Sequence, residues 1–391
     1  MLTPNMAPRP KLATSHTPSY DARHYDFDAH PKRLQGAINR EVIREEADFP
    51  GPQCFARAFE FLDRNAGAED WLLQIECFDP HEPFHSPERF RAMFPTGYEG
   101  PVLDWPNYAR VTESEGEIAE IRANYAALVA MCDEYFGRLL DRFDADGLWG
   151  DTALILSTDH GFLLAEHDWW AKCRQPYYEE IAHIPLMVAH PAHRDRAGER
   201  RAALTQTGDL MPTFLELFGQ PVPREVRARS LLPLLAADGP HHEAVVFGVF
   251  GGPIGVTDGR HAFYHYPPDT RAEGLHEYTL APQHMTGPFE ARELRTATLD
   301  PGFDFTKGAP VLKVNALPDA KRVPMNDGLG WGDDETMLFD LGADPRQERP
   351  CRDAVIEERL YAQMIRVLRA HDAPAEVYSW YRLPVAADAP A

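Results

Sequence analysis

The stretch that decides the fold is DTALILSTDHGFLLAEHDWWAKCRQPYYEEIAHIPL, residues 151–186. An apolar run over 153–156 is followed by Ser157-Thr158 and then at once by Asp159-His160-Gly161. This pattern predicts a buried strand that brings a carboxylate and an imidazole to its carboxyl end, with a glycine that permits a sharp exit. Ligands of open α/β sheets bind just outside the carboxyl ends of strands, and both Asp and neutral His bind divalent cations. We therefore expect Asp159 and His160 to form part of a metal site.

Five short motifs in this stretch have the order and spacing of the sulfatase family, within the alkaline-phosphatase superfamily, and the chain resembles that family. They are Asp159-His160-Gly161, Ala165-Glu166-His167, Trp170-Ala171-Lys172, Tyr178-Glu179-Glu180 and Ile184-Pro185-Leu186. Ala165 replaces the usual glycine, which restricts the loop backbone slightly. The resemblance extends over roughly residues 50–370, through DLMPT at 209–213, RSLLP at 229–233, VTDGR at 256–260 and LFDLGADP at 338–345.

The resemblance implies roles for single residues around this segment. Asp159 and His160 match metal ligands, with Ca²⁺ as the ion that the family suggests and Mn²⁺ or Mg²⁺ as alternatives. Lys172 matches the lysine that contacts the substrate sulfate. A lysine in this place offsets charge that develops on the ester oxygens, and a divalent cation polarises the same group.

Three histidines outside the Asp159-His160-Gly161 motif carry separate expectations. His81, in the segment His81-Glu82-Pro83-Phe84, matches an active-site histidine of the family, and a histidine acts as general acid or base near neutral pH. His167 is a candidate substrate-binding residue, or a group that orients the metal ligands. His85 matches no motif and is expected at the surface.

The nucleophile is the part of a sulfatase that the resemblance does not supply. Sulfatases begin with a strand bearing paired aspartates, followed by Cys- or Ser-x-Pro-Ser-Arg, whose first residue becomes formylglycine. Here no cysteine stands in that pattern, and the Asp-Asp pair is Asp333-Asp334, in the C-terminal region. We therefore expect that formylglycine is not encoded in this chain and that the catalytic unit is truncated or incomplete. A partner chain or a second copy would then cover the exposed sheet edge.

Three functions remain open on this basis. The first is a sulfatase-like, metal-dependent hydrolase of sulfuric esters, similar to arylsulfatases and acting on a small-molecule sulfate ester. The second is a phosphodiester or phosphonate monoester hydrolase of the same superfamily, which His160 allows. The third is a non-catalytic remnant that serves as a binding or assembly subunit.

Composition excludes several kinds of partner. The formal net charge of −22 argues against nucleic acid and anionic membrane surfaces, which attract clusters of Lys and Arg. There is no uninterrupted apolar run of the roughly 18 residues that a membrane span requires. The five cysteines are scattered without metal-ligand spacing, which fits a reducing compartment. Residues 1–20 lack the apolar core of a signal peptide, so we expect a cytoplasmic protein.

Alternating helix and strand patterns predict an α/β protein with an alkaline-phosphatase-like layered fold and a largely parallel sheet. Helices are predicted over 53–64, 114–147, 209–218 and 355–370, and strands over 71–78, 153–156, 184–189 and at several places between 245 and 341. We expect an irregular segment over 1–50, a sulfatase-like α/β core over 51–240, and a small antiparallel α+β subdomain over 241–391.

Overall fold

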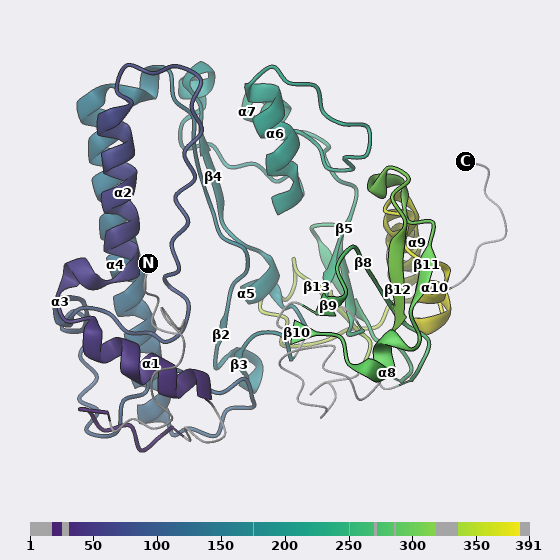
Figure 1. Ribbon diagram of the computed structural model, residues 1–391, viewed down its shortest axis with the longest axis horizontal. Coiled ribbons are helices and arrows are strands. Elements are labelled where there is room, and N and C mark those ends of the chain that lie inside the picture. The colour runs from purple at the N-terminus through teal and green to yellow at the C-terminus, as the bar shows by residue number, and fades with distance from the viewer. Residues whose placement is uncertain are drawn as a thin grey trace. The chain divides into compact units, whose positions relative to one another are not determined.

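The structure is a computed structural model that describes residues 18–25, 31–174, 176–249, 251–269, 272–284, 287–317 and 335–383 (Figure 1). The chain forms two compact units. Unit 1 comprises Met1–Ala153 and Leu164–Ala171, and unit 2 comprises Leu154–Leu163 and Lys172–Ala391. The Asp159-His160-Gly161 segment therefore belongs to unit 2, whereas Ala165-Glu166-His167 belongs to unit 1.

Unit 1 is built on helix α4 (Glu115–Asp146), whose two ends are set by its sequence. Ser114 precedes the helix, and its Oγ accepts a hydrogen bond from N of Glu117 while the Glu117 carboxylate accepts from N of Ser114. This capping box satisfies backbone donors at the first turn. At the other end Gly147 has φ 70°, the left-handed conformation that terminates helices and favours glycine. The predicted helix over 114–147 is confirmed.

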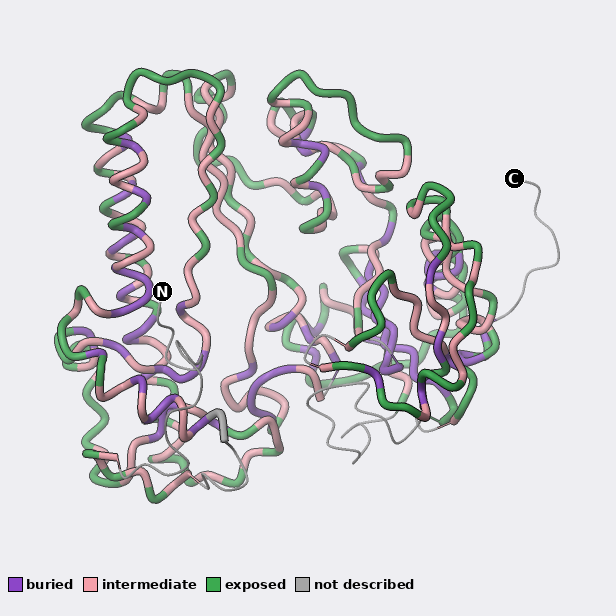
Figure 2. The backbone as a smooth tube through the Cα atoms, in the orientation of Figure 1, coloured by how far each residue is buried: buried purple, intermediate pink, exposed green. Residues whose placement is uncertain are grey.

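Helix α2 (Pro50–Arg64) packs against α4 and supplies the other half of the core of unit 1. Figure 2 shows buried residues recurring along the overlapping helices α2 and α4. The apolar members of this core are Phe55, Ala58 and Leu62 of α2 with Ile121, Leu128, Met131 and Leu139 of α4. The remaining elements of unit 1 are α1 (Pro31–Val42), η1 (Glu46–Asp48), α3 (Glu88–Arg91), η2 (Leu148–Gly150), η3 (Glu166–Asp168) and β3 (Trp170–Ala171).

The prediction of a strand over residues 71–78 is wrong. These residues have no regular secondary structure, and no strand among the described residues pairs with them. A strand is stable only with a hydrogen-bonded neighbour, so an apolar run without one packs on the nearest helix instead. Here the ring of Trp71 contacts that of Phe61 in α2, with centroids 5.8 Å apart, and Sγ of Cys54 donates to the carbonyl of Glu76 at 3.3 Å.

In unit 2, strand β1 (Leu154–Ser157) pairs antiparallel with β4 (Leu186–Ala189), with Leu154 opposite Ala189 and Ser157 opposite Leu186. Helix α5 (Glu179–Ala182) lies between them in the chain, and β2 (Leu163–Leu164) follows β1. Further along are η4 (Pro191–Arg196), η5 (Thr207–Asp209), α6 (Leu210–Leu217) and α7 (Leu232–Ala236).

The C-terminal half of unit 2 carries an antiparallel sheet of four strands in the order β13-β7-β6-β5. They are β5 (Val245–Gly248), β6 (Ile254–Thr257), β7 (His261–His265) and β13 (Met337–Asp340). Helix α9 (Ala354–Ala370) packs on this sheet through Leu360, Met364 and Ile365, which join Val256, Phe263 and Leu338 in one hydrophobic cluster. The predicted strands between 245 and 341 and the predicted final helix are confirmed.

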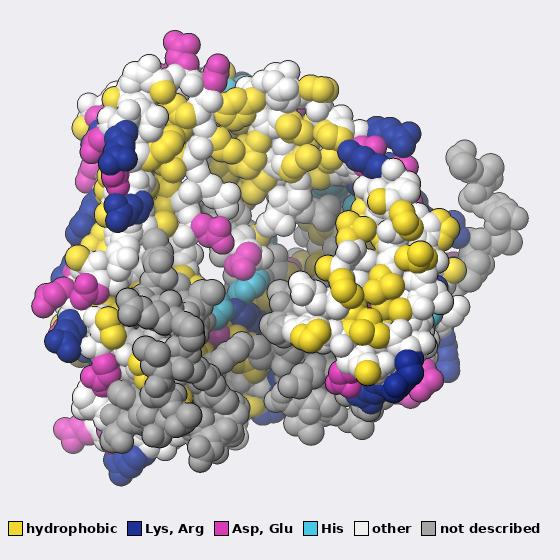
Figure 3. All heavy atoms as spheres, viewed as in Figure 1, with side chains coloured by type: hydrophobic (Ala, Val, Ile, Leu, Met, Phe, Trp, Pro, Cys, Tyr) yellow, Lys and Arg dark blue, Asp and Glu magenta, His cyan; other side chains and the backbone are white. Residues whose placement is uncertain are grey.

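A second antiparallel sheet has the order β11-β12-β8, from β8 (His276–Thr279), β11 (Thr298–Asp300) and β12 (Val311–Asn315). Strands β9 (Gln283–His284) and β10 (Gly287–Pro288), helices α8 (Ala291–Leu294) and α10 (Ala375–Trp380), and η6 (Asp304–Thr306) complete the unit. Figure 3 shows hydrophobic side chains gathered over β11 and β12, where Leu299 is 77% exposed.

The expected largely parallel sheet is not confirmed. The ladders between β1 and β4 and within the two C-terminal sheets all run antiparallel, and none of the described strand pairs is parallel. In unit 2, β1 pairs only with β4 among the described strands, and it does so antiparallel. Within the described part of the chain, no helix has both the length and the apolar composition that a membrane crossing demands.

Candidate functional site

The Asp159-His160-Gly161 segment leaves the end of β1 and is fixed by hydrogen bonds to α5 and to the residues that follow it. N of Gly161 donates to the carbonyl of Ile181 at 2.9 Å, and Oγ of Ser157 donates to the carbonyl of Pro185 at 3.0 Å. A Cβ at Gly161 would lie 1.8 Å from the carbonyl oxygen of Glu180. The glycine is therefore required by this close approach of two backbones, and not by the sharp exit that the sequence suggested.

His160 is held between a backbone carbonyl and a lysine. Its Nδ1 lies 2.9 Å from the carbonyl oxygen of Gly161, and its Nε2 lies 3.1 Å from Nζ of Lys172. An ammonium group has only donors, so Nε2 of His160 must accept from Lys172. The ring proton is then on Nδ1, where it is donated to Gly161.

The two groups beside His160 differ sharply in exposure. Lys172 is only 7% exposed, and its Nζ lies 5.9 Å from the centroid of the Phe162 ring, within reach of a cation–π contact. The Asp159 side chain is 83% exposed, and its Oδ2 lies 3.5 Å from Nε2 of His160. The site thus combines a nearly buried cation with a carboxylate that faces solvent.

A divalent cation fits Asp159 and His160 only in part. Two ligands of a Ca²⁺-like ion, each about 2.4 Å from it, stand roughly 3.4 Å apart in octahedral geometry, close to the 3.5 Å between Oδ2 of Asp159 and Nε2 of His160. The lone pair of Nε2 is used by Lys172, however. A metal ion and the lysine ammonium therefore compete for the same nitrogen.

His81 belongs to unit 1, so the expectation that it faces one cleft with Asp159 and Lys172 stays a prediction. Its Nδ1 lies 2.7 Å from the carbonyl oxygen of Glu82 and 3.2 Å from Oε2 of the same residue. Glu82 is buried, and the hydroxyl of Tyr108 donates to its Oε1. A buried carboxylate next to Nδ1 orients the imidazole.

His167 and His85 have different surroundings from each other. His167 lies in a strained segment with φ 53°, and its carbonyl accepts from Nη1 of Arg110 at 3.3 Å. Its role in substrate binding remains a prediction.

The expectation that His85 is a surface residue is wrong. Its Nδ1 accepts from Nη2 of Arg40 at 2.8 Å, and its ring lies 5.0 Å from that of Phe49. Burial and the nearby charge of Arg40 hold the pKa of His85 well below its ordinary value.

Two clusters that the sequence did not single out bring potential metal ligands together in unit 2. They are Asp209 with His241 and His242, and Glu277 with His284 and Glu293. In the first, burial alone would raise the pKa of Asp209, but donors at N of Arg229 and Gln206 and at His242 together hold it below its usual value. The sequence marks Asp209 as a helix start and as part of the DLMPT motif, and the adjacent pair His241-His242 is the signal that could have indicated the first cluster.

Comparison with known proteins relates the central region of the chain to sulfatases. Residues 51–220, the central region of the chain, match the family model described as Sulfatase. The chain is 36% identical over 167 residues to arylsulfatase K of Xenopus laevis, covering 43% of this chain and 30% of the relative. It is 29% identical over 212 residues to the multifunctional alkaline phosphatase superfamily protein PehA of Trinickia caryophylli, covering 47% of this chain and 41% of the relative. The chain therefore spans less than half the length of these curated relatives.

Solved structures show the same fold at lower sequence identity. A phosphonate monoester hydrolase of Agrobacterium radiobacter superposes with a TM-score of 0.53 at 17% identity, covering 84% of this chain and 62% of that chain. A structure concerned with glycosaminoglycan metabolism by Bacteroides thetaiotaomicron gives 0.55 at 18% identity, covering 84% and 61%. These neighbours have an alkaline-phosphatase-like fold. The predicted resemblance to sulfatases is confirmed by the match over residues 51–220.

Proposed function

We propose that this chain provides the anion-binding and metal-binding part of a sulfatase-like hydrolase of sulfuric esters. The observation that carries the proposal is the contact between Lys172 and His160 beside the exposed carboxylate of Asp159. A buried ammonium attracts an ester anion more strongly than an exposed one, because less water screens its charge. The substrate would be a small molecule bearing a sulfate group.

In this proposal Asp159 and His160 hold a divalent cation, with Ca²⁺ as the first candidate and Mn²⁺ or Mg²⁺ as alternatives. The ion would supply Lewis-acid polarisation of a sulfate oxygen. When Lys172 leaves Nε2 of His160, its three N–H donors become available to the oxygens of the ester. His81 acts as the general acid or base, with Glu82 holding its Nδ1, and His167 contributes to substrate binding.

Covalent hydrolysis also needs a nucleophile, and none of the residues assigned above is one. Formylglycine would have to be formed from a residue outside the motifs quoted, so we propose that this chain by itself turns over aryl sulfates very slowly. The Asp333-Asp334 pair lies outside the described residues and is assigned no role.

A phosphonate monoester or phosphodiester hydrolase is the second candidate. An imidazole ligand at His160 suits softer cations than an all-oxygen site does, and such ions are common in phosphoryl transfer. The superfamily relationship in the central region supports either reaction. The choice between sulfate and phosphonate depends on which ester the Lys172 site binds.

The proposal also covers the partners of the chain and its cellular compartment. The residues Leu154, Ile155 and Leu156 of β1 are only half-buried, which favours a partner chain or a second copy along this edge. Nucleic acid and membranes are poor partners for a chain of net charge −22. No disulfide joins any two of the five cysteines, all of which are described residues, and this supports a reducing, cytoplasmic compartment.

Ligand binding to the full chain tests the proposal. An aryl sulfate and an aryl phosphonate are titrated calorimetrically with and without millimolar Ca²⁺, alongside Lys172→Ala and the exposed control Lys307→Ala. We expect the sulfate ester to bind and Lys172→Ala to weaken it at least tenfold, whereas Lys307→Ala leaves it unchanged. Tighter binding of the phosphonate would favour the second candidate. Equal binding by Lys172→Ala and the unaltered chain would overturn the site, and no binding of either ester would leave an assembly role.

A further inference from the structure

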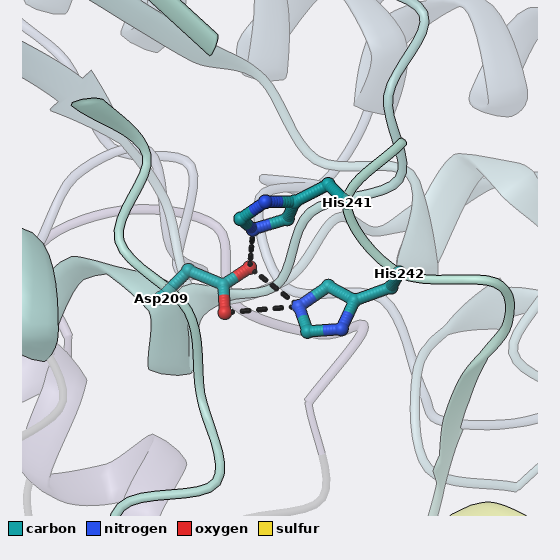
Figure 4. Close-up of side chains that lie close together, drawn as sticks. All are labelled: Asp209, His241 and His242. Atoms are coloured by element: carbon teal, nitrogen blue, oxygen red, sulfur yellow. Dashed lines mark hydrogen bonds and ion pairs between the residues drawn. The ribbon is translucent and has the colours of Figure 1, made fainter. Parts of the chain in front are cut away.

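Three side chains of unit 2 converge at the start of α6, away from the Asp159-His160-Gly161 segment in the sequence. Figure 4 shows the imidazoles of His241 and His242 both directed at the carboxylate of Asp209. Nε2 of His241 lies 3.2 Å from Oδ2 of Asp209. Nε2 of His242 lies 3.0 Å from Oδ1 and 2.9 Å from Oδ2. Both rings thus present the same nitrogen to one carboxylate.

The cluster is buried and held in place by the backbone around it. Asp209 is fully buried at 0% exposure, and the side chains of His241 and His242 are 6% and 9% exposed. The carboxylate also accepts from N of Arg229 and from N of Gln206, each at 2.9 Å. These backbone bonds fix Asp209 independently of the two histidines, so the three side chains are preorganised for a shared ligand.

The donor set and its spacing match a tetrahedral transition-metal site. Two imidazole nitrogens and one carboxylate oxygen are ligands typical of Zn²⁺, each about 2.0–2.1 Å from the ion, so that neighbouring ligands stand roughly 3.3 Å apart. The separations of 2.9 to 3.2 Å between the two nitrogens and the carboxylate oxygens are close to this edge. Three protein ligands leave one position for water. A hard ion such as Ca²⁺ prefers six or more oxygens and suits this cluster poorly.

We propose that Asp209, His241 and His242 bind a divalent transition-metal ion of the Zn²⁺ type, at a site separate from Asp159 and His160. Asp209 lies within the region that matches the sulfatase family, whereas the two histidines precede β5 and lie beyond it. A metal ion would therefore join the start of α6 to the segment that leads into the four-stranded sheet. Because its ligands are buried and come from two segments distant in the sequence, the ion would stabilise the folded unit when it is bound.

The alternative is a purely hydrogen-bonded cluster, in which each Nε2 carries a proton and donates to Asp209. His242→Gln separates the two readings, because glutamine retains an N–H donor at a similar place but lacks the imidazole nitrogen. The hydrogen-bonded arrangement tolerates this change, whereas a metal site loses a ligand. Asp209→Ala is a poor test, because it also removes the acceptor for N of Arg229 and Gln206 and destabilises the fold.

The experiment uses the full chain, freed of metal by a chelator and titrated with Co²⁺, whose visible absorption reports tetrahedral ligation. We expect one equivalent to bind, Zn²⁺ to displace it, and His242→Gln to weaken binding at least tenfold. The control His193→Gln, which lies outside both clusters of potential metal ligands, should bind as the unaltered chain does. Zn²⁺ should raise the melting temperature of the unaltered chain but not of His242→Gln, while their metal-free melting temperatures agree.

Three results would overturn the proposal. The first is the absence of tetrahedral Co²⁺ absorption in the unaltered chain. The second is equal affinity in His242→Gln. The third is a loss of binding in His284→Gln alone, which would assign the ion to the cluster of Glu277, His284 and Glu293.

Discussion

Nζ of Lys172 lies 3.1 Å from Nε2 of His160, just beyond the carboxyl end of β1. Because an ammonium cannot accept a hydrogen bond, this contact requires a neutral His160 whose lone pair is on Nε2. A metal ion that binds His160 at Nε2 needs the same lone pair. Lys172 therefore restrains metal binding twice, by occupying the ligand and by repelling the cation.

Replacing Lys172 by methionine should strengthen metal binding at Asp159 and His160. Two like charges about 4 Å apart repel by about 4 kcal/mol at an effective dielectric constant of 20, and solvent at the exposed Asp159 reduces this. We expect the affinity for Mn²⁺, measured by calorimetry, to rise about tenfold in Lys172→Met. The exposed Lys307→Met serves as the control and should leave it unchanged. An unaltered Mn²⁺ affinity in Lys172→Met would mean that the lysine and the ion do not share His160.

The unaltered chain should bind hard cations weakly at Asp159. One carboxylate and one imidazole give a single formal negative charge, where Ca²⁺ prefers six or more oxygens, so we expect dissociation constants in the millimolar range. Thermal melts with Ca²⁺, Mg²⁺ or Mn²⁺ should shift little at micromolar concentration and visibly only near millimolar. Asp159→Ala should abolish the millimolar shift. A large shift at micromolar metal that Asp159→Ala removes would show that further ligands complete this site.

The local elements of the fold were predictable, because their signals are contained in short segments. Ser114 and Gly147 mark the ends of α4 in the sequence, and the apolar run before Asp159 marks β1. The run over 71–78 was misread because its apolar character does not reveal whether a neighbouring strand exists. Pairing is a property of the whole sheet, and a single segment cannot specify it.

The two candidate sites differ in how far apart their residues lie in the sequence. His160 and Lys172 are 12 residues apart and were expected together. His241 and Asp209 are 32 residues apart and are joined only by the path of the chain around α7. No periodicity links them, so the contact of Asp209 with His241 and His242 is seen only in the three-dimensional structure.

Gly161→Ala should destabilise unit 2. The added methyl group would lie 1.8 Å from the carbonyl oxygen of Glu180, and this atom belongs to the backbone of α5 and cannot rotate away. Overpacking against backbone typically costs about 1–3 kcal/mol, and we expect the upper end of that range. Gly208→Ala is the matched control in the same unit, because its Cβ would make an ordinary contact at 3.7 Å with Ala228. Urea unfolding of both variants provides the measurement, and equal midpoints would contradict the close approach.

Ala165→Gly should stabilise unit 1. Ala165 has φ 78°, a left-handed conformation that costs residues with a Cβ roughly 1–2 kcal/mol and glycine almost nothing. Part of this gain is lost because glycine is more flexible in the unfolded chain, so we expect a net stabilisation of about 0.5–1 kcal/mol. Ala123→Gly within α4 should have the opposite sign, since glycine in a helix interior costs about 1 kcal/mol. If both variants melt at a lower temperature than the unaltered chain, Ala165 does not have the left-handed conformation on which this prediction rests.

Asp79→Asn should stabilise unit 1 at neutral pH, because burial raises the pKa of Asp79 to about 6 from its ordinary 3.8. The pKa of Asp79 is higher in the folded chain than in the unfolded chain, so the chain is most stable below about pH 4, where the carboxyl is protonated in both states. The free energy of unfolding then falls as the pH rises from about 4 to about 6. At pH 7 the ionised form costs about 3 kcal/mol, from roughly two pKa units at about 1.4 kcal/mol each. Asparagine carries no charge and can still accept from N of Gly51, which donates to Oδ2 at 3.1 Å. Unfolding free energies at pH 5 and pH 7.5 should therefore show a larger gain at the higher pH for Asp79→Asn, and little change at either pH for the exposed control Asp133→Asn. A gain that does not grow with pH would mean that Asp79 ionises as freely in the folded chain as in water.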